Sequence, residues 1–426
     1  MSAPVVLALT FVICLIMGVP IAFTIGVSTM AALWVGGIPF AFLAQNLFSA
    51  TDSFAIMAVP FFILAGALME TGGLSRRLID VANAVVGRFT GGLGMVTILA
   101  CAFFAAISGS SPATVAAIGT MMIPAMVKRG YHKTFASSVA ASGGGLGILI
   151  PPSIPMIIYG VVGNVSIGQM FLAGFLPGLF ISSILLGTVY FIAKKKGYKG
   201  SGEPFIMKNF MKVAREGFWA LLAPVIILGG IYSGIFTPTE SAVVAVVYGL
   251  IIGIFVYKEL KWKDLPRVFV NSAMVTGSVM IIVGMAAAFS KLITMYQIPN
   301  MLGQMLLGVS EHKLVVLALI NLVILFAGMW METLSLIIIF TPLFLPIVLN
   351  LGVDPIHFGI MLVIAAEIGL MTPPVGVNLF VASGISGVPL EKLSKGILPF
   401  IIVMIIGLFV ITYIPQISLF LPQLFR

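Results

Sequence analysis

The sequence predicts an all-α integral membrane protein made of two related halves. Its 426 residues are 60% hydrophobic and 8% charged, and its mean hydropathy of +1.21 lies far above that of soluble globular domains. Apolar runs of about 20 residues follow one another from residue 4 to residue 422. Such long, glycine-rich runs are typical of membrane helices and exclude the short alternating strands of an outer-membrane barrel.

A spacing of 222 residues relates the two halves. Four prolines recur at this offset without a gap, and four other residues obey it. The pairs are Pro124 and Pro346, Pro151 and Pro373, Pro152 and Pro374, Pro177 and Pro399, Gly130 and Gly352, Gly147 and Gly369, Gly174 and Gly396, and Leu176 and Leu398. The chain is therefore two copies of one unit, each with a Pro-Pro step that should break a helix. An interrupted segment repeated in both halves points to a transport site.

The basic residues indicate which loops face the cytoplasm. A basic run at 194–215 follows the apolar span 171–193, so the positive-inside rule places that loop in the cytoplasm. The next apolar pair, 217–236 and 240–257, ends at a second basic cluster, which is cytoplasmic as well. The net charge of +9 is therefore interpreted as a topology signal, and no nucleic-acid partner is expected.

Copy one contains a predicted hairpin and a predicted broken helix. Residues 95–126 are apolar except for a polar centre at 108–112, which leaves arms of about 15 residues, or roughly 22 Å of helix. These arms are shorter than the hydrocarbon core of about 30 Å, so we expect a re-entrant hairpin that enters from the cytoplasm and returns to it. The span 134–160 that follows is interrupted by a run of three glycines and by Pro151 and Pro152.

Copy two repeats these elements with the flanking charges reversed. The loop before its broken helix, 350–355, contains no Lys or Arg, whereas its counterpart holds Lys128, Arg129 and Lys133. The two repeats are therefore predicted to be inverted, and the second hairpin, 314–348, to enter from the outside. Two full spans over the same residues would leave the loops on the same sides, so charge alone leaves both arrangements open.

Polar groups at membrane depth form the candidate binding site. A helix that stops in mid-membrane frees backbone carbonyls, which suit Na⁺, and N–H groups, which suit an anion. Ser and Thr hydroxyls add the hard oxygen ligands that alkali cations prefer. The candidates for substrate and Na⁺ binding are Ser108, Gly109, Ser110, Ser111, Thr114, Gly143, Gly144, Gly145, Glu332, Thr333, Gly369, Thr372 and Asn378. Pro151, Pro152, Pro373 and Pro374 are predicted to break the helices without touching substrate.

A structural role is the alternative for these residues. Ser, Thr and Gly also allow close helix packing and bond to neighbouring carbonyls. Two carboxylates, Glu332 at the second tip and Glu367 before the second break, are candidates to bind a cation or to carry a proton. The alternative for each is a charge near the outer surface or a carboxylate held by N–H groups at a helix start.

The remaining motifs argue against an enzyme. The three His, at 132, 312 and 357, show no zinc spacing, and there is no GxSxG elbow. The serine cluster has no His within its motif to activate a nucleophile. An ion channel and an intramembrane enzyme are the less favoured alternatives. Pores usually form at symmetric subunit interfaces with repeated selectivity rings, and a membrane enzyme would need a reactive pair, which is not evident in the sequence.

Two local features have structural interpretations. Thr237 and Glu240 form a predicted capping box with Pro238 at the first helical position, so Glu240 needs no catalytic role. Residues 205–218 have charges spaced among apolar residues and are predicted to form either an amphipathic helix on the cytoplasmic surface or an ordinary loop.

Three separated motifs resemble the signatures of the large membrane subunit of TRAP transporters, the DctM-like family. They are GGGLGILIPPSIPMIIYG at 143–160, GIFTPTESA at 234–242 and GLMTPPVGVNLF at 369–380. The resemblance implies a multi-pass subunit of the bacterial inner membrane that works with a small four-helix membrane subunit and a periplasmic substrate-binding protein. It also implies uptake of an organic acid coupled to Na⁺, without other cofactors, by an elevator motion. The expected substrate is sialic acid, with a C4-dicarboxylate or another carboxylate as the alternative.

The family picture divides the chain into expected functional regions. The transport domain would hold hairpin and broken helix one at 93–180 and hairpin and broken helix two at 314–400. The scaffold would hold the helices of 1–92 and those of 181–313 with their basic cytoplasmic loops, and 401–426 would be the end of the last span and a tail. The surrounding lipid is the remaining expected partner.

Overall fold

Helices are the regular elements throughout the residues that the structure, a computed structural model, describes: 2–200, 206–310 and 312–425. The first half contains α1 (Ala3–Ile16), α2 (Ile21–Gly36), α3 (Ala41–Thr51), α4 (Ala58–Thr71), α5 (Leu74–Val86), α6 (Gly92–Ser108), α7 (Ser111–Lys128), α8 (Lys133–Gly144), α9 (Leu146–Leu149), α10 (Ile154–Val162) and α11 (Ile167–Lys196). The second contains α12 (Met207–Glu216), α13 (Phe218–Tyr232), α14 (Pro238–Ile251), η1 (Ile252–Val256), η2 (Trp262–Asp264), α15 (Leu265–Met295), α16 (Ile298–Val309), α17 (Lys313–Gly328), α18 (Thr333–Asn350), α19 (Pro355–Leu370), α20 (Val377–Ser386), α21 (Leu390–Tyr413) and α22 (Gln416–Leu424).

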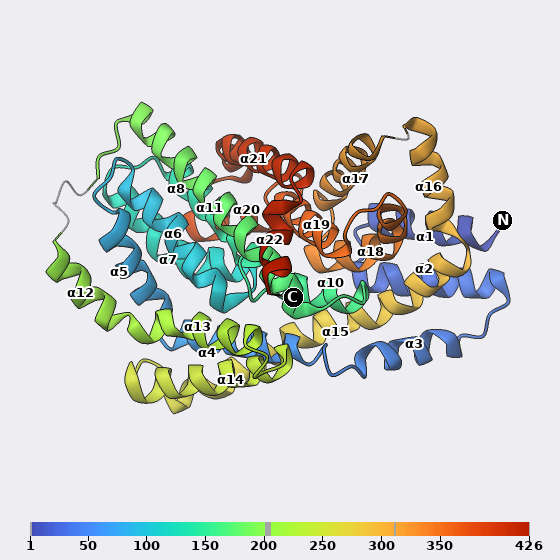
Figure 1. Cartoon of the computed structure of the whole chain (residues 1–426), viewed down its shortest axis with the longest axis horizontal. Coiled ribbons are helices and arrows are strands. Elements are labelled where there is room, and N and C mark those ends of the chain that lie inside the picture. Colours follow the sequence, from blue (N-terminus) through green and yellow to red (C-terminus); the bar gives the residue numbers. More distant parts are fainter. Residues whose placement is uncertain (1, 201–205, 311, 426) are drawn as a thin grey trace.

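The helices are long and apolar enough for a multi-span membrane protein. Among the described residues, five helices could cross a membrane, or up to eight if each bent helix pair is counted as one span. In Figure 1, α10, α19 and α20 lie in the middle of the molecule, α12 lies at one end of its long axis, and α1, α2 and α16 lie at the other. The prediction of an all-helical membrane protein is confirmed.

The first hairpin consists of α6 and α7, which pack against each other. α6 ends where Gly109 adopts a left-handed conformation with φ of +60°, which glycine tolerates without a steric penalty. Ser110 is extended, and α7 begins at Ser111 with Pro112 in its first turn, where the missing N–H costs nothing. The turn therefore falls inside the polar centre of 95–126.

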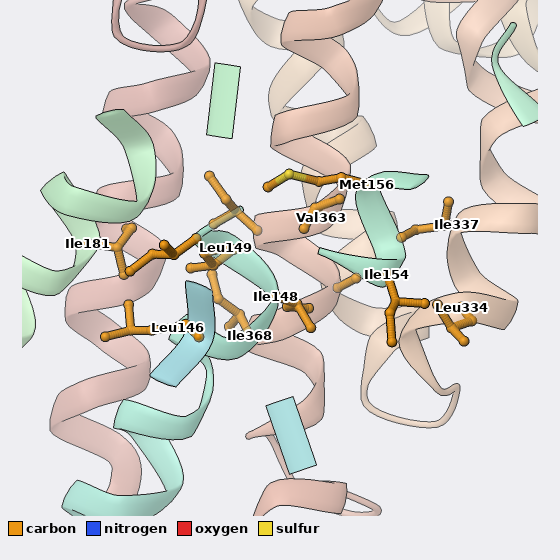
Figure 2. Close-up of a cluster of buried hydrophobic side chains, with 14 of the residues drawn as sticks. Leu146, Ile148, Leu149, Ile154, Met156, Ile181, Leu334, Ile337, Val363 and Ile368 are labelled. Atoms are coloured by element: carbon orange, nitrogen blue, oxygen red, sulfur yellow. The ribbon is translucent and has the colours of Figure 1, made fainter. Parts of the chain in front are cut away.

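The first broken helix consists of α8, α9 and α10, and the combined α8 and α9 are bent by 41° against α10. The bend falls at Pro151 and Pro152, and Ser153 caps α10 by accepting a hydrogen bond from the backbone N–H of Met156. The side chains around this break are buried and apolar, and Figure 2 shows them coming from α9, α10, α11, α18 and α19. They include Leu146, Ile148, Leu149, Ile154, Met156, Ile181, Leu334, Ile337, Val363 and Ile368.

Copy two forms the same succession of elements. α17 ends at Gly328 and α18 begins at Thr333, so the second turn contains Met331 and Glu332. α19 ends at Leu370 and α20 begins at Val377, so the second Pro-Pro step lies between them. Both predicted breaks are therefore present, and both Pro-Pro peptide bonds are cis.

The region expected to hold the end of the last span and a tail, 401–426, also contains the helix α22. This helix packs back against α11 and α19. The ring of His357 joins α19 to both α22 and α21, because Nδ1 lies 2.7 Å from Ser418 Oγ on α22 and Nε2 lies 3.2 Å from the carbonyl oxygen of Thr412 on α21. Proline at 415 precedes α22 and separates it from α21, which explains why one apolar run of sequence gives two helices.

Residues 207–216 form the helix α12, which is the helical alternative for 205–218; Phe205 lies outside the described residues. None of the residues of α12 is buried. Met207 and Met211 are each 61% exposed, on a helix that also carries Lys208, Lys212 and Arg215. This pattern is typical of a helix that lies along a membrane surface.

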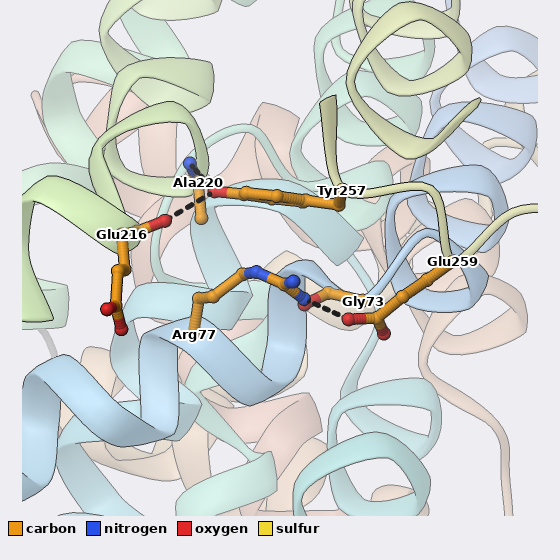
Figure 3. A network of polar contacts seen from close by, with 6 residues as sticks. All are labelled: Gly73, Arg77, Glu216, Ala220, Tyr257 and Glu259. Carbon is orange, nitrogen blue, oxygen red and sulfur yellow. Dashed lines mark hydrogen bonds and ion pairs between the residues drawn. The ribbon is translucent and has the colours of Figure 1, made fainter. Parts of the chain in front are cut away.

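A polar network fixes the end of α12 to α5, as Figure 3 shows. The guanidinium of Arg77 donates to the carbonyl of Gly73 over 2.7 Å, pairs with Glu259 and lies 3.8 Å from the centre of the Tyr257 ring. The Tyr257 hydroxyl donates to the Glu216 carbonyl and accepts from the Ala220 N–H, both over 3.2 Å. Three segments are therefore held together: α5, the turn after η1, and the junction between α12 and α13.

Candidate transport site

A buried polar cluster joins the two copies where their broken segments meet. The hydroxyl of Ser111 donates to Oε1 of Glu367 over 2.9 Å. The amide nitrogen of Asn378 donates to Ser111 Oγ over 2.7 Å and to Glu367 Oε1 over 2.9 Å. All three side chains are fully buried. We call Ser111, Glu367 and Asn378 the central cluster.

The helix breaks position these three side chains. Ser111 is the first residue of α7, directly after the first turn, and Asn378 is the second residue of α20, directly after the second break. Glu367 lies on the last turn of α19, before that break. A Cβ built on Gly145 would lie 2.6 Å from Glu367 Oε1, so the first break passes against the carboxylate with no room for a side chain. Three of the four interrupted segments, the first hairpin and both breaks, thus contribute to one place.

Three buried oxygen atoms at the turns and breaks have no hydrogen-bond partner among the described residues, and six other such atoms lie elsewhere in the described structure. The three are Glu367 Oε2, Asn378 Oδ1 and, at the second turn, Thr333 Oγ1. A buried polar atom without a partner costs about 1–3 kcal/mol, so such atoms call for an explanation. Carboxylate, amide and hydroxyl oxygens are the ligands that hard cations prefer. The central cluster therefore has the chemistry of a cation site.

The first turn carries a second group of oxygen atoms. Ser108 Oγ lies 2.8 Å from Thr114 Oγ1, and the Thr114 hydroxyl donates to the Ser110 carbonyl over 2.8 Å. Ser108 is 5% exposed and Thr114 is fully buried. These contacts are also what a structural role would produce, because each hydroxyl already has a partner.

The second turn forms its own local cluster. Glu332 is the N-cap residue of α18, and Ser335 Oγ donates to its Oε2 over 3.4 Å. Thr333 is 3% exposed and follows directly. Among the described residues, no hydrogen bond joins Glu332 or Thr333 to Ser111, Glu367 or Asn378. Glu332 and Thr333 therefore lie outside the central cluster.

The glycines of the two breaks allow close backbone approach. A Cβ on Gly147 would lie 2.5 Å from the Ser110 carbonyl oxygen, and one on Gly369 would lie 2.6 Å from Gly328 Cα. Both glycines, which the offset of 222 pairs, thus pack against the hairpin turn of their own copy. Gly144 lies against the side chain of Val115, and Gly143 lies against the side chain of Cys101.

Equivalent backbone hydrogen bonds tie each break to its hairpin. In copy one, the Ile154 N–H donates to the carbonyl of Gly109 over 3.2 Å. In copy two, the Val375 N–H donates to the carbonyl of Met329 over 3.2 Å. The two breaks differ in their surroundings. Pro151 and Pro152 are buried, whereas Pro374 is exposed, Pro373 is half-buried, and the half-buried Thr372 donates its hydroxyl to the Ile368 carbonyl.

The pairing of Ser111 with Glu367 is the feature that sequence reasoning missed. Glu367 was a candidate for a cation or a proton, but no spacing said which copy-one residue it would meet. A signal was present, because the offset of 222 that pairs the prolines also pairs Gly145 with Glu367. The copy-one position lacks a side chain where the copy-two position has a carboxylate, and the two meet in space.

Basic side chains are absent from the segments that form the site. Residues 89–127, 134–193 and 314–391 contain no Lys or Arg. In the part of the chain that the structure describes, no three His, Cys, Asp or Glu side chains gather that could hold a metal ion. An ion bound here would have to use hydroxyl, amide and backbone oxygens beside a single carboxylate.

Comparisons with known proteins agree with this architecture. Residues 8–417 match the family described as tripartite ATP-independent periplasmic transporter, DctM component. The isethionate TRAP transporter permease protein DctMQ of Oleidesulfovibrio alaskensis is 47% identical over 411 residues, which are 96% of this chain and 65% of that protein. The C4-dicarboxylate TRAP transporter large permease protein DctM of Pseudomonas aeruginosa is 44% identical, and the match covers 89% of each chain.

Two further similarities bear on substrate and fold. The sialic acid TRAP transporter large permease protein SiaM of Vibrio cholerae is 39% identical over 96% of each chain. Among solved structures, the YdaH transporter of Alcanivorax borkumensis superimposes with a TM-score of 0.64, over 88% of each chain and at 15% identity. That last similarity concerns the fold alone.

Proposed function

The chain is a large permease subunit of the DctM family of tripartite ATP-independent periplasmic transporters, and we propose that it imports a small organic acid together with Na⁺. It belongs to a family of transporters and is not an enzyme. The observation that carries the proposal is the central cluster, in which interrupted segments of both copies meet around unpartnered buried oxygens.

The proposed cargo is a C4-dicarboxylate or a comparably small acid such as a hydroxyalkyl sulfonate. Relatives named for isethionate and for C4-dicarboxylates are 47% and 44% identical, whereas the relative named for sialic acid is 39% identical. This order favours the alternative that the sequence analysis kept beside sialic acid. The chain spans 65% of the length of the isethionate relative. The name of that relative therefore supports a class of substrate for this chain, a small acid, and not one particular compound.

An acid in this site would need positive charge from other sources than side chains, since the site segments lack Lys and Arg. The helices α7 and α20 both begin at the site. The N-terminus of a helix carries about half a positive charge, which attracts an anion. Bound Na⁺ would supply the rest. Affinity for the acid should therefore depend strongly on Na⁺.

The proposed Na⁺ ligands are hard oxygens of the broken segments. Glu367 Oε2 and Asn378 Oδ1 in the central cluster and Thr333 Oγ1 at the second turn have no partner among the described residues. Backbone carbonyls freed at the two breaks and the hydroxyls of Ser108 and Thr114 are further candidates. A single carboxylate with neutral oxygens suits a monovalent ion, because a divalent ion would require more negative charge.

An elevator motion is the proposed mechanism, with 93–180 and 314–400 as the transport domain. α20 packs on α7 and α8, and α10 packs on α18, so hairpins and breaks of both copies pack together. α15 packs on α2, α3 and α4, which supports a scaffold made from 1–92 and 181–313. The reversed loop charges support inverted repeats.

The family implies two protein partners. A small four-helix membrane subunit would cover the scaffold, and a periplasmic binding protein would deliver the acid. The isethionate relative is named DctMQ and extends beyond the part that this chain matches, which fits a second subunit in the same polypeptide.

Uptake by reconstituted protein tests the proposal. The chain would be placed in liposomes with its small subunit and binding protein, and labelled succinate, isethionate and sialic acid would be offered under an inward Na⁺ gradient. We expect saturable uptake of one of the two small acids, lost when choline replaces Na⁺. Uptake that is unchanged in choline would refute Na⁺ coupling, and uptake of sialic acid alone would refute the proposed cargo.

A further inference from the structure

A cavity that shares no lining residue with the central cluster lies between α5, α12, the loop between α7 and α8, and the end of α11. Its volume is about 1040 Å³. The positive-inside rule places all of these segments at the cytoplasmic end of the protein. Figure 1 shows α5 and α12 together at one end of the long axis. We propose that this cavity binds the phosphate group of an anionic phospholipid.

The charge of the lining favours an anion. Five basic side chains and two acidic ones line the cavity. The basic residues are Arg88, Arg129, Lys196, Lys199 and Lys212, and the acidic residues are Asp80 and Glu216. Among the described residues, no ion pair neutralises Arg129, Lys196, Lys199 or Lys212. A positive concavity of this kind concentrates anions.

Both walls of the cavity are held in place before any ligand binds. On one side the Tyr198 hydroxyl accepts from the His132 N–H over 3.0 Å, and the rings of Tyr131 and Tyr198 stack with their centres 4.3 Å apart. On the other side the network of Arg77 and Tyr257 fixes the end of α12 (Figure 3). A preformed site loses less entropy on binding than a mobile one.

The position of the cavity selects a lipid rather than a free anion. α12 forms one wall, and its exposed Met207 and Met211 would lie among acyl chains if the helix lies along the membrane surface. The basic side chains of the lining would then lie at the depth of the lipid phosphates. Basic pockets between helices on the cytoplasmic side are suited to anionic head groups, and each Lys or Arg near the surface adds to the attraction.

Lipid binding to the purified full chain tests this site. Arg129 and Lys212 are chosen for substitution because both are exposed and they come from different walls of the cavity. Thermal unfolding and native mass spectrometry would compare wild type with an Arg129→Gln, Lys212→Gln variant after addition of phosphatidylglycerol or phosphatidylcholine. The matched control is Lys263→Gln, Arg267→Gln, which removes the same charges from exposed positions at the same predicted end but outside the cavity.

We expect phosphatidylglycerol, but not phosphatidylcholine, to stabilise wild type and control, and its affinity to fall roughly tenfold or more in the cavity variant. Arg129→Lys, Lys212→Arg should restore binding, which separates lost charge from lost folding. Glycerol phosphate alone would be measured as well: stabilisation equal to that by the lipid would assign the site to a soluble phosphate. Equal affinity in the cavity variant and the control, or no effect of any phosphate compound, would overturn the site.

Discussion

Ser111 and Glu367 are 256 residues apart in the chain, yet the hydroxyl of Ser111 donates to the carboxylate of Glu367 over 2.9 Å. The first is at the start of a hairpin arm in copy one, and the second is one turn before the break in copy two. Since both are fully buried, the contact requires the two copies to be packed as they are here. The central cluster therefore couples the fold of the duplicated protein to its proposed ion site.

Replacing Glu367 by Gln tests the ion site directly. The amide keeps the size of the side chain but removes the negative charge that a cation would need. A hydrogen bond to a charged group is worth about 1.5–3 kcal/mol. We therefore expect the Na⁺ concentration for half-maximal uptake to rise roughly ten- to hundredfold. The measurement is initial uptake against Na⁺ concentration in liposomes. Glu391→Gln, at an exposed position on α21, is the control and should leave uptake unchanged. Full Na⁺-driven uptake by Glu367→Gln would show that the carboxylate is only structural.

A methyl group at position 145 should displace the same carboxylate. The Cβ of a Gly145→Ala variant would lie 2.6 Å from Glu367 Oε1, which is closer than real contacts allow. Overpacking a close-packed site costs about 1–3 kcal/mol, so we expect lower thermal stability together with weak uptake. Gly187→Ala on α11 is the control, because nothing lies within 4 Å of its Cβ. If the two variants have the same thermal stability and the same uptake, the contact between the first break and Glu367 does not contribute to function.

The breaks were predictable because their causes are local. Two consecutive prolines remove two donors and clash with the preceding turn, so the Pro-Pro steps mark interruptions, whereas the single prolines Pro124 and Pro177 lie inside the continuous helices α7 and α11. Duplication at a fixed offset then shows that both copies are interrupted in the same place. The distribution of Lys and Arg predicted the side of the membrane on which each loop lies. This signal also comes from short segments of the sequence.

The central cluster was not predictable in the same way. Which side chain meets Glu367 depends on how two copies pack, and no spacing along one chain encodes that contact. α22 escaped prediction for a different reason: its apolar sequence continues that of α21, and only Pro415 separates them. Interactions that cross between copies or reverse the chain direction are set by tertiary packing.

The capping box at the start of α14 should stabilise the protein. Thr237 and Glu240 bond reciprocally: the Thr237 N–H and hydroxyl donate to Glu240 Oε2 over 2.8 and 2.9 Å, and the Glu240 N–H donates to Thr237 Oγ1 over 3.2 Å. A capping box satisfies backbone N–H groups that the first turn of a helix otherwise leaves unpaired, and loss of such a cap costs about 0.5–2 kcal/mol.

Glu240→Ala removes the carboxylate that accepts from Thr237, so it tests the capping box. We expect the variant to unfold at a lower temperature than wild type, through a loss of about 0.5–2 kcal/mol. Thermal unfolding in detergent gives the result, and an unchanged unfolding temperature would show that the box does not stabilise the protein.

Arg77 provides the last test, of the network that joins α5 to the end of α12. Its exposed ion pair with Glu259 is worth about 0–1 kcal/mol, and its contact with the Tyr257 ring about 0.5–1 kcal/mol. Arg77→Ala should therefore destabilise the protein by about 1 kcal/mol in denaturant unfolding.

Tyr257→Phe keeps the ring and loses only the bonds to Glu216 and Ala220. Because Arg77 and Tyr257 are in contact, the effects of the two variants should not simply add when they are combined, and the difference measures their coupling. Arg76→Ala, an exposed neighbour on the same helix, should have little effect, and equal losses for Arg76→Ala and Arg77→Ala would show that general charge, rather than this network, stabilises the junction.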